Sequence, residues 1–106
     1  MKTGIEIIAE ERARQITAEG WTPEHDDQHN RKGLAIAAAC YALPEEHREY
    51  SLAGNWEMIS LLDLLWGHTL WDRQWWKPTP NNRIRELAKA GALCAAEIDR
   101  LQRKET

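Results

Sequence analysis

Residues 18–29, with the sequence AEGWTPEHDDQH, concentrate side chains that could bind a metal ion or a polar ligand. Carboxylate oxygens are preferred by magnesium and similar cations, and imidazole nitrogens bind many other divalent metals. The candidate ligands are Glu24, His25, Asp26, Asp27 and His29, of which the two histidines would share one helical face. The same pattern is typical of a solvated helix start, where acids interact favourably with the helix dipole. A metal site, a capped turn and the edge of a ligand pocket therefore all stay open.

A second group combines tryptophans with basic residues in the sequence WDRQWWKPTPNNRIR. The chain has six tryptophans and no phenylalanine, and an indole offers both a broad aromatic face and an N–H donor. Indole faces stack on purines, and basic residues in the first turn of a helix attract phosphate. The members are Trp71, Trp75, Trp76, Lys77, Arg83 and Arg85. They predict a site for a base and its phosphates, or alternatively an apolar plug at the end of a bundle or at a subunit interface.

Acidic side chains on two predicted helices form a third candidate site. Helical enzymes that hydrolyse nucleoside triphosphates hold magnesium with carboxylates from facing helices, usually three residues apart on each helix. In this chain Glu6 and Glu10 are four residues apart, and Glu97 and Asp99 are two apart. An ordinary charged surface is the other interpretation of this pattern.

The elements that would position these residues are all predicted to be helices. Apolar residues recur at helical spacing from Thr3 to Glu19, and Gly20 is suited to end that helix. A threonine, a proline and a glutamate at 22–24 then form a new helix start. Residues 33–43 are apolar on nearly every side, which predicts a buried helix that ends at the proline opening a short helix over 44–50.

The second half of the chain predicts two longer helices joined by an irregular connector. Asn55 is suited to cap a helix over 56–68. The last helix, from Asn82 to Gln102, has apolar residues three and four apart that predict tight packing against a partner helix. Those residues are Ile84, Leu87, Gly91, Cys94, Ile98 and Leu101, and the seam is widened by Ala88, Ala92 and Ala95. Strand-favouring residues are few and valine is absent, so the expected architecture is all-α, a compact bundle of about four main helices with short extra helical turns.

Composition narrows the class of protein. The 106 residues are expected to form one domain spanning 1–106, and its small size favours a homo-oligomer. A net charge of −3, with basic residues scattered along the chain, argues against duplex nucleic acid as a partner. No apolar run is long enough for a membrane span and the first residues lack a secretory signal, so a cytoplasmic protein with no membrane partner is expected. Cys40 and Cys94 lie in alanine-rich apolar runs, which favours buried, reduced thiols.

Short motifs in the first half of the chain match a known pattern in order and approximate spacing. They are Gly20-Trp21-Thr22, Asp26-Asp27, Tyr41 with Leu43-Pro44-Glu45-Glu46, and Glu49-Tyr50. Over about Glu11 to Leu62 they resemble the ryanodine-receptor repeat, although the family usually has Tyr-Gly-Pro at residues 22–24 and Asp in place of Ser51. The resemblance implies a helical domain that binds adenine nucleotides or ADP-ribose-like molecules, with Trp21 stacking on the base.

Longer motifs cover nearly the whole chain. These are EGWTPEHDDQH at 19–29, AAACYA at 37–42, WWKP at 75–78, and the segment 89–101. They resemble a group of small proteins of tailed phages and prophages. That resemblance suggests two roles, the sequestration of cyclic or ADP-ribose-type immune signals of a host, or the hydrolysis of pool nucleotides.

The function expected from the sequence is binding of a nucleotide-derived small molecule such as ADP-ribose or a cyclic nucleotide, without turnover and without a cofactor. Trp21 and one or more of Trp71, Trp75 and Trp76 would stack on the base. Phosphates would meet Lys77, Arg83 and Arg85, and ribose hydroxyls would meet Asp26, Asp27 or His29. The alternative is a magnesium-dependent nucleoside triphosphate pyrophosphohydrolase, whose metal would be held by Glu6, Glu10, Glu24, Asp26 and Asp27. A protein-interaction module that uses the tryptophan patch is a third possibility.

Overall fold

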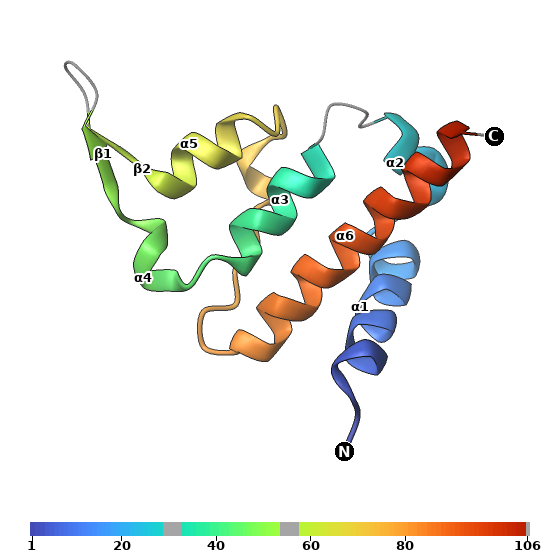
Figure 1. Cartoon of the computed structure of the whole chain (residues 1–106). Helices are drawn as coiled ribbons and strands as arrows, with labels where there is room; N and C mark the ends of the chain where they lie inside the picture. Colours follow the sequence, from blue (N-terminus) through green and yellow to red (C-terminus); the bar gives the residue numbers. More distant parts are fainter. Residues whose placement is uncertain (29–32, 54–57, 106) are drawn as a thin grey trace.

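The computed structural model describes residues 1–28, 33–53 and 58–105, which form an all-α bundle with one small hairpin (Figure 1). The helices are α1 (Gly4–Ala18), α2 (Pro23–Gln28), α3 (Gly33–Ala42), α4 (Glu45–Arg48), α5 (Leu61–Gly67) and α6 (Arg83–Glu105), and a 3-10 helix, η1, spans Arg73–Trp75. The all-α expectation is confirmed. None of the described helices has both the length and the apolar character that a membrane span needs.

Local capping determines where the first two helices begin. The Thr3 hydroxyl accepts a hydrogen bond from the Glu6 N–H at 3.2 Å, and the Glu6 carboxylate accepts one from the Thr3 N–H at 3.2 Å. This capping box satisfies two backbone donors that an isolated helix end leaves free. Gly20 has a φ of 72°, the left-handed conformation expected after the last turn of α1. The Thr22 hydroxyl accepts from the His25 N–H at 3.3 Å, as predicted for a helix that starts with proline.

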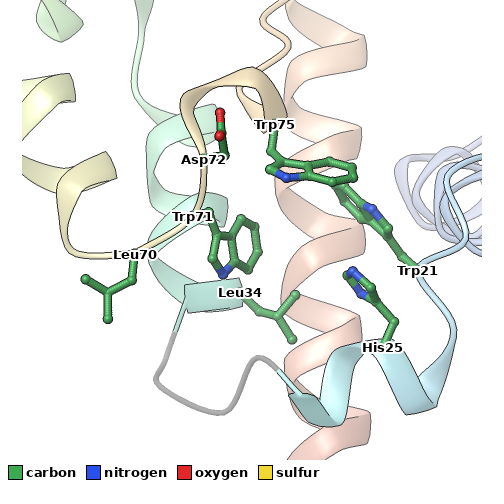
Figure 2. A pocket seen from close by; sticks show the side chains of 7 residues that line it. All are labelled: Trp21, His25, Leu34, Leu70, Trp71, Asp72 and Trp75. Atoms are coloured by element: carbon green, nitrogen blue, oxygen red, sulfur yellow. The ribbon is translucent and has the colours of Figure 1, made fainter.

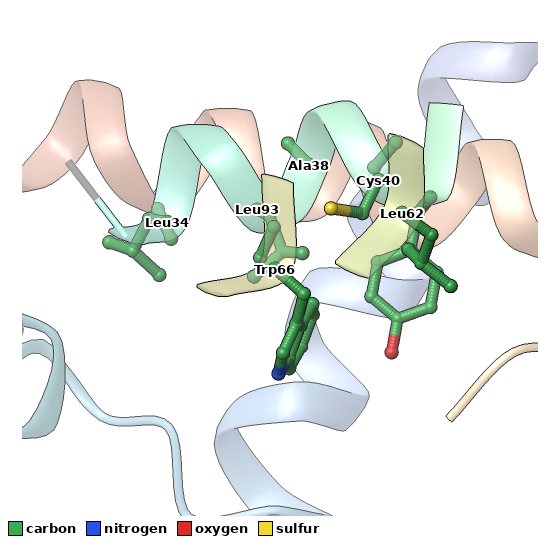
Figure 3. Close-up of a cluster of buried hydrophobic side chains, with 10 residues drawn as sticks. Leu34, Ala38, Cys40, Leu62, Trp66 and Leu93 are labelled. Atoms are coloured by element: carbon green, nitrogen blue, oxygen red, sulfur yellow. The ribbon is translucent and has the colours of Figure 1, made fainter. Parts of the chain in front are cut away.

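The hydrophobic core lies where α3 packs against α6 and α5 (Figure 3). Leu34 of α3, Leu93 of α6 and Trp66 of α5 are exposed by 2%, 0% and 3%. The other members of the core cluster are Ala37, Ala38, Cys40, Tyr41, Leu62, Ala90 and Ala96. Many of these residues are alanines, and their small side chains let the backbones of α3 and α6 approach closely. The predicted burial of the helix over 33–43 is therefore confirmed for one face, while Ala35, Ala39 and Ala42 are exposed.

The prediction that the chain contains no strand is wrong at one place. Strands β1 (Ser51–Ala53) and β2 (Met58–Ser60) pair antiparallel, with Leu52 opposite Ile59. Figure 1 shows this hairpin projecting from the helices. The helix expected from Asn55 begins instead at Leu61, because the Ser60 hydroxyl caps it by accepting from the Asp63 N–H at 3.0 Å. Asn55 itself lies outside the described residues.

The prediction for the packing face of the last helix is confirmed for Ala88 and Ala92, which are buried, and is wrong for its large apolar residues. Ile84, Leu87, Ile98 and Leu101 are exposed by 67%, 46%, 56% and 44%, so no described part of the chain covers them. The buried residues of α6 are mainly alanines, together with Leu93 and three charged residues. They are Glu86, Ala88, Lys89, Ala90, Ala92, Leu93, Ala96 and Arg100. Small side chains allow α1 and α3 to pack close to α6. The large seam residues would keep these helices farther apart.

A buried carboxylate joins the end of α3 to the start of α6. Glu86 is exposed by 1%, and its Oε2 accepts from Arg48 at 3.1 Å and from the Thr79 N–H at 3.0 Å. Arg48 also donates to the carbonyls of Cys40 and Tyr41, which are left without partners at the end of α3. One network thus satisfies a buried charge and caps a helix.

Removal of this carboxylate is expected to destabilise the fold strongly. Glu86→Gln leaves the Arg48 guanidinium buried without its counter-charge, which costs about 3–5 kcal/mol. Urea unfolding at neutral pH measures the loss. Asp63→Asn is the matched control, because its ion pair with Arg73 is half exposed (54% and 50%) and such pairs contribute about 1 kcal/mol or less. Equal losses in the two variants would contradict the assignment.

The same carboxylate predicts a pH dependence of stability. Burial disfavours its charge, but the hydrogen bond and charge of Arg48 outweigh burial and hold the pKa of Glu86 below the ordinary glutamate value. The contribution of Glu86 to the free energy of unfolding is therefore complete above its pKa in the unfolded chain, about 4.3. This contribution is lost as the pH falls through its pKa in the folded chain. Urea midpoints measured across this range should decline less steeply in Glu86→Gln than in the parent chain.

Candidate functional site

Three of the predicted tryptophans surround a cavity of about 190 Å³ (Figure 2). Trp21 comes from the connection between α1 and α2, Trp71 from the loop after α5, and Trp75 from η1. The other lining residues are His25, Leu34, Leu70 and Asp72. Figure 2 shows Trp71 on one side and Trp21, Trp75 and His25 on the other, with Leu34 between them. Segments far apart in the sequence therefore build a single site.

The loop after α5 is held by hydrogen bonds to a buried threonine. The Thr69 hydroxyl, in a residue exposed by 2%, donates to the Trp66 carbonyl at 2.7 Å and accepts from the Trp71 N–H at 3.0 Å. Between them Leu70 adopts a φ of 62°, which L residues with large side chains rarely do. The Asp72 carboxylate then caps η1 by accepting from the Gln74 N–H at 2.9 Å. This geometry fixes the directions of Trp71 and Trp75.

Trp71 packs on a glycine. A Cβ atom added at Gly33 would lie 2.8 Å from the indole nitrogen of Trp71 and 3.0 Å from its Cε2. The edge of the Trp71 ring also packs against Trp66, with ring centroids 6.0 Å apart and planes at 85°. The first residue of α3 and the core tryptophan of α5 therefore position this wall of the cavity.

The opposite wall consists of three rings. The planes of Trp21 and His25 are parallel within 4°, with centroids 6.3 Å apart, and Trp75 lies 6.2 Å from Trp21 at 56°. The Trp21 indole N–H is buried and has no hydrogen-bond acceptor among the described residues. A ligand or a water that accepts this bond would remove an energetic cost of about 1–3 kcal/mol.

A buried tyrosine behind this wall fixes the chain from Trp75 to Lys77. The Tyr41 hydroxyl accepts from the Lys77 N–H at 2.9 Å and donates to the Trp75 carbonyl at 3.4 Å. Burial raises the pKa of Tyr41 to about 12, so the hydroxyl stays protonated at neutral pH. Gln15, exposed by 2%, and Lys89 border a void of about 20 Å³ here, which has room for one water.

The size and lining of the aromatic cavity favour a flat, compact ligand. Protein cavities of about 150 Å³ accommodate benzene, so about 190 Å³ suits one heterocycle rather than a whole nucleotide. Aromatic rings bind such a ligand through stacking and edge contacts. Asp72 and His25 are the polar lining residues, and they can hydrogen-bond amino and hydroxyl groups.

Two other predicted residues of the tryptophan segment lie next to the cavity but do not line it. Trp76 packs into the core, 4.6 Å from the ring of Tyr41 and 5.4 Å from that of Trp66, with the Arg48 guanidinium 5.0 Å from its centroid. Lys77 pairs with Glu19 at 3.2 Å, and its ammonium lies 5.9 Å from the Trp75 ring. Trp76 is therefore structural, and Lys77 is a cation at the back of the aromatic wall.

The two predicted arginines lie elsewhere. Arg83 caps the end of α3 by donating to the carbonyls of Tyr41, Ala42 and Leu43, and it pairs with Glu86. Arg85 is exposed and lines a separate open groove between α1 and α6 that also contains two glutamates and Arg14. Neither arginine lines the aromatic cavity. The expected meeting of base and phosphate sites at Arg83 is therefore not formed.

The acidic stretch is largely structural where it is described. Asp26 is fully buried and forms an ion pair with Arg12 at 2.6 Å, so it is not available to ribose hydroxyls. The Asp27 side chain and His29 lie outside the described structure. Among the described residues, no three His, Cys, Asp or Glu side chains gather closely enough to hold a metal ion.

The carboxylates of the hydrolase alternative are dispersed. Glu6 is occupied by the capping box of α1, and Glu10 pairs with Lys2 at 2.8 Å. Glu97 pairs with Arg100 at 2.5 Å on α6, and the exposed Glu24 lies in the first turn of α2. The described carboxylates therefore lack the shared site that a magnesium-bound water would need.

Four lining residues were not among the predicted ligand-binding residues: His25, Leu34, Leu70 and Asp72. His25 was considered only as a metal ligand. Asp72 stands beside Trp71 in the sequence, which is a usable signal. The positive φ of Leu70 leaves no signal in the sequence, because leucine is not a residue that favours this conformation.

A substitution at Gly33 is expected to disturb the cavity. Gly33→Ala places a methyl group against Trp71, and overpacking of this kind costs about 1–3 kcal/mol. Urea unfolding and near-ultraviolet circular dichroism of the indoles measure the effect. Gly67→Ala is the matched control, since a Cβ there has no atom within 4 Å and alanine favours the helix. A Gly33→Ala variant as stable as Gly67→Ala would refute this packing.

Comparison with known proteins does not assign the chain to a family. No protein-family model, no curated protein and no solved structure matches it significantly. The resemblances to the ryanodine-receptor repeat and to the phage proteins therefore stay predictions, and the geometry of the cavity provides the basis for a functional proposal.

Proposed function

We propose that this chain is a binding module for a nucleotide-derived small molecule, whose heterocycle enters the cavity between Trp71 and the rings of Trp21 and Trp75. The observation that carries the proposal is the cavity itself, which is about 190 Å³ in volume and is walled by three indoles from three segments. Indoles chosen only for packing would be expected to fill the space between them. A cavity left between three of them favours a ligand.

The conformation of Leu70 supports the same site. Its φ of 62° costs about 1–2 kcal/mol for an L residue, and its side chain is 70% exposed. Packing of the Leu70 side chain against other described residues therefore does not offset this cost. Strained residues of this kind cluster at ligand sites. Figure 2 shows the Leu70 side chain directed away from the indoles, so Leu70 would serve the site by holding the neighbouring Trp71 in place.

The polar residues of the cavity indicate which chemical groups of the ligand would lie beside the base. Asp72 and His25 are suited to hydroxyl and amino groups, as in a ribose or an exocyclic amine. A phosphate would be repelled by Asp72 and would need a cation outside the cavity. Lys77, on the far side of Trp75, is the one of the three predicted phosphate-binding residues that contacts an aromatic ring of the site. A base in the cavity, with its sugar beside Asp72 and His25 and the phosphate extending to solvent, fits this arrangement.

Binding without turnover would allow the protein to sequester its ligand. Neither a nucleophile with an adjacent base nor a cluster of carboxylates is recorded around the described cavity, whose polar groups are one carboxylate and one imidazole beside indole N–H groups. A sequestered signal of the ADP-ribose or cyclic-nucleotide class is the physiological form of this proposal. Such a role requires affinity for the ligand and no catalytic step.

Titration with a ligand panel tests the proposal. Adenosine, ADP-ribose, a cyclic dinucleotide and ATP are added to the protein while indole fluorescence and heat are followed. At least one is expected to quench fluorescence with a dissociation constant of tens of micromolar or less. Trp71→Ala should weaken that binding by about tenfold or more, since stacking contributes about 1–3 kcal/mol per base. Arg85→Ala is the control and should bind as the parent does. The absence of heat and quenching throughout the panel, or loss of binding in Arg85→Ala alone, would overturn the proposal.

Leu70 offers a test that separates binding from folding. Leu70→Gly relieves the positive φ and is expected to stabilise the fold by about 1 kcal/mol, while it loosens the loop that holds Trp71 and weakens binding. Thermal unfolding and the fluorescence titration measure the two effects. Leu64→Ala removes an apolar side chain 36% exposed on α5 and should leave binding unchanged. Stabilisation with unaltered affinity would mean that the conformation of Leu70 does not serve the ligand site.

A further inference from the structure

The exposed face of α6 carries a regular apolar stripe. It consists of Ile84, Leu87, Gly91, Cys94, Ile98 and Leu101, at successive spacings of three, four, three, four and three residues. This is the a and d pattern of two and a half heptads, which in paired helices forms the seam between them. The four large side chains are exposed by 44% to 67%, and Cys94 is exposed as well. Among the described residues, Ile8 of α1 covers Gly91, and no helix covers the other five members of the stripe.

The stripe is self-complementary when it is reversed. Its midpoint falls between Ala92 and Leu93, and each member has a counterpart at equal distance on the other side. Two copies of α6 that run antiparallel about this midpoint place Ile84 opposite Leu101, Leu87 opposite Ile98, and Gly91 opposite Cys94. Branched apolar side chains therefore meet branched apolar side chains, and the small residues meet at the centre. A two-fold interface requires such a self-complementary surface.

Small side chains lie beside the stripe, and α1 covers its central glycine. Ala90 and Ala95 flank it with small side chains, and Ile8 of α1 packs over Gly91, where an added Cβ would lie 2.5 Å from the Ile8 Cδ1. Ile8 thus continues the apolar surface across the glycine. Ile5, one turn earlier on α1, is 82% exposed and extends the surface further. Figure 1 shows α1 and α3 on different sides of α6.

The exposed area and the shape of the chain both favour a partner. Side chains of about 200 Å² exposed to this extent leave roughly 400 Å² of apolar surface on each copy, as large as the patches that monomers seldom leave without a function. Pairing would bury roughly 1,000 Å² with the flanking residues, the lower end of specific interfaces. The radius of gyration is 14.6 Å, against about 13 Å for a compact chain of this length.

We propose that a second copy of this chain docks antiparallel on the α6 stripe and forms a two-fold dimer. The surface is distinct from the aromatic cavity, since no residue of the stripe lines that cavity. Branched side chains on both sides of the midpoint provide the apolar contact, and Cys94 lies next to the midpoint. An interface of this size is expected to have a micromolar dissociation constant.

The central cysteine gives the arrangement a chemical signature. The two copies of Cys94 would be offset by three residues along the helix axes, or about 4.5 Å. With helices about 8 Å apart their Cα atoms lie about 6 Å from one another, within the range of a disulfide. Diamide would take up the two electrons and two protons that two thiols release on forming the bond. Cys40, the other cysteine, is fully buried and does not compete.

Sedimentation equilibrium from about 1 to 200 µM tests the dimer. The parent chain is expected to dimerise, and Ile98→Glu to weaken dimerisation at least tenfold, because it places two charges in the seam. Ile59→Glu is the matched control, a substitution of an isoleucine 37% exposed in the hairpin, and should dimerise as the parent does. A monomer at every concentration, or an undiminished dimer of Ile98→Glu, would overturn the proposal.

Cysteine pairs distinguish antiparallel from parallel docking. In a Cys94→Ser background, a mixture of Leu87→Cys and Ile98→Cys chains treated with diamide should give mainly the mixed disulfide, since these positions face one another across the midpoint. A parallel pair would instead join Leu87→Cys to itself and Ile98→Cys to itself. Predominance of the self-joined products would overturn the antiparallel arrangement, and so would absence of all disulfides at concentrations where the chain dimerises.

Discussion

The buried Glu86 carboxylate constrains the arrangement of most of the chain. It can be buried only if positive charge and donors reach it, and these come from three places in the sequence: Arg48 of α4, the Thr79 N–H of the connector, and Arg83 at the start of α6. The same two arginines bind the free carbonyls at the end of α3. Since an unpaired buried charge is strongly unfavourable, these elements must come together cooperatively. The Arg48 guanidinium also lies over Trp76, which attaches the aromatic connector to the same network.

The aromatic cavity follows from this constraint. The connector from α5 to α6 is fixed near its start by Thr69 and at its end by Thr79, and between these points Tyr41 binds the backbone on both sides of Trp76. Trp71 and Trp75 are therefore held in defined directions although they lie outside a long helix. Two rings held rigidly opposite Trp21 can keep a cavity between them that flexible side chains would close.

Sequence reasoning worked where the determinant is local. The cap at Thr22 and the left-handed Gly20 depend on residues within one helical turn, and the structure has both as expected. The tryptophans were identified as candidates from residue type alone. The partner of each charged residue could not be predicted, because it depends on packing between distant segments. Arg83 has the residue type for phosphate but binds the carbonyls of α3, and Asp26 has the type for ribose but binds Arg12.

The exposed stripe of α6 shows that a sequence pattern does not identify the partner of a helix face. A three-four apolar repeat predicts that a helix face has a partner, yet it does not indicate whether the partner belongs to the same chain. Within this chain α1 and α3 pack instead on the alanines Ala88, Ala92 and Ala96, which give closer backbone contact than the large residues could. The large residues are then left for an outside partner. Because the cavity is built before residue 76 and the stripe lies after residue 83, ligand binding and self-association use separate side chains and can be measured independently.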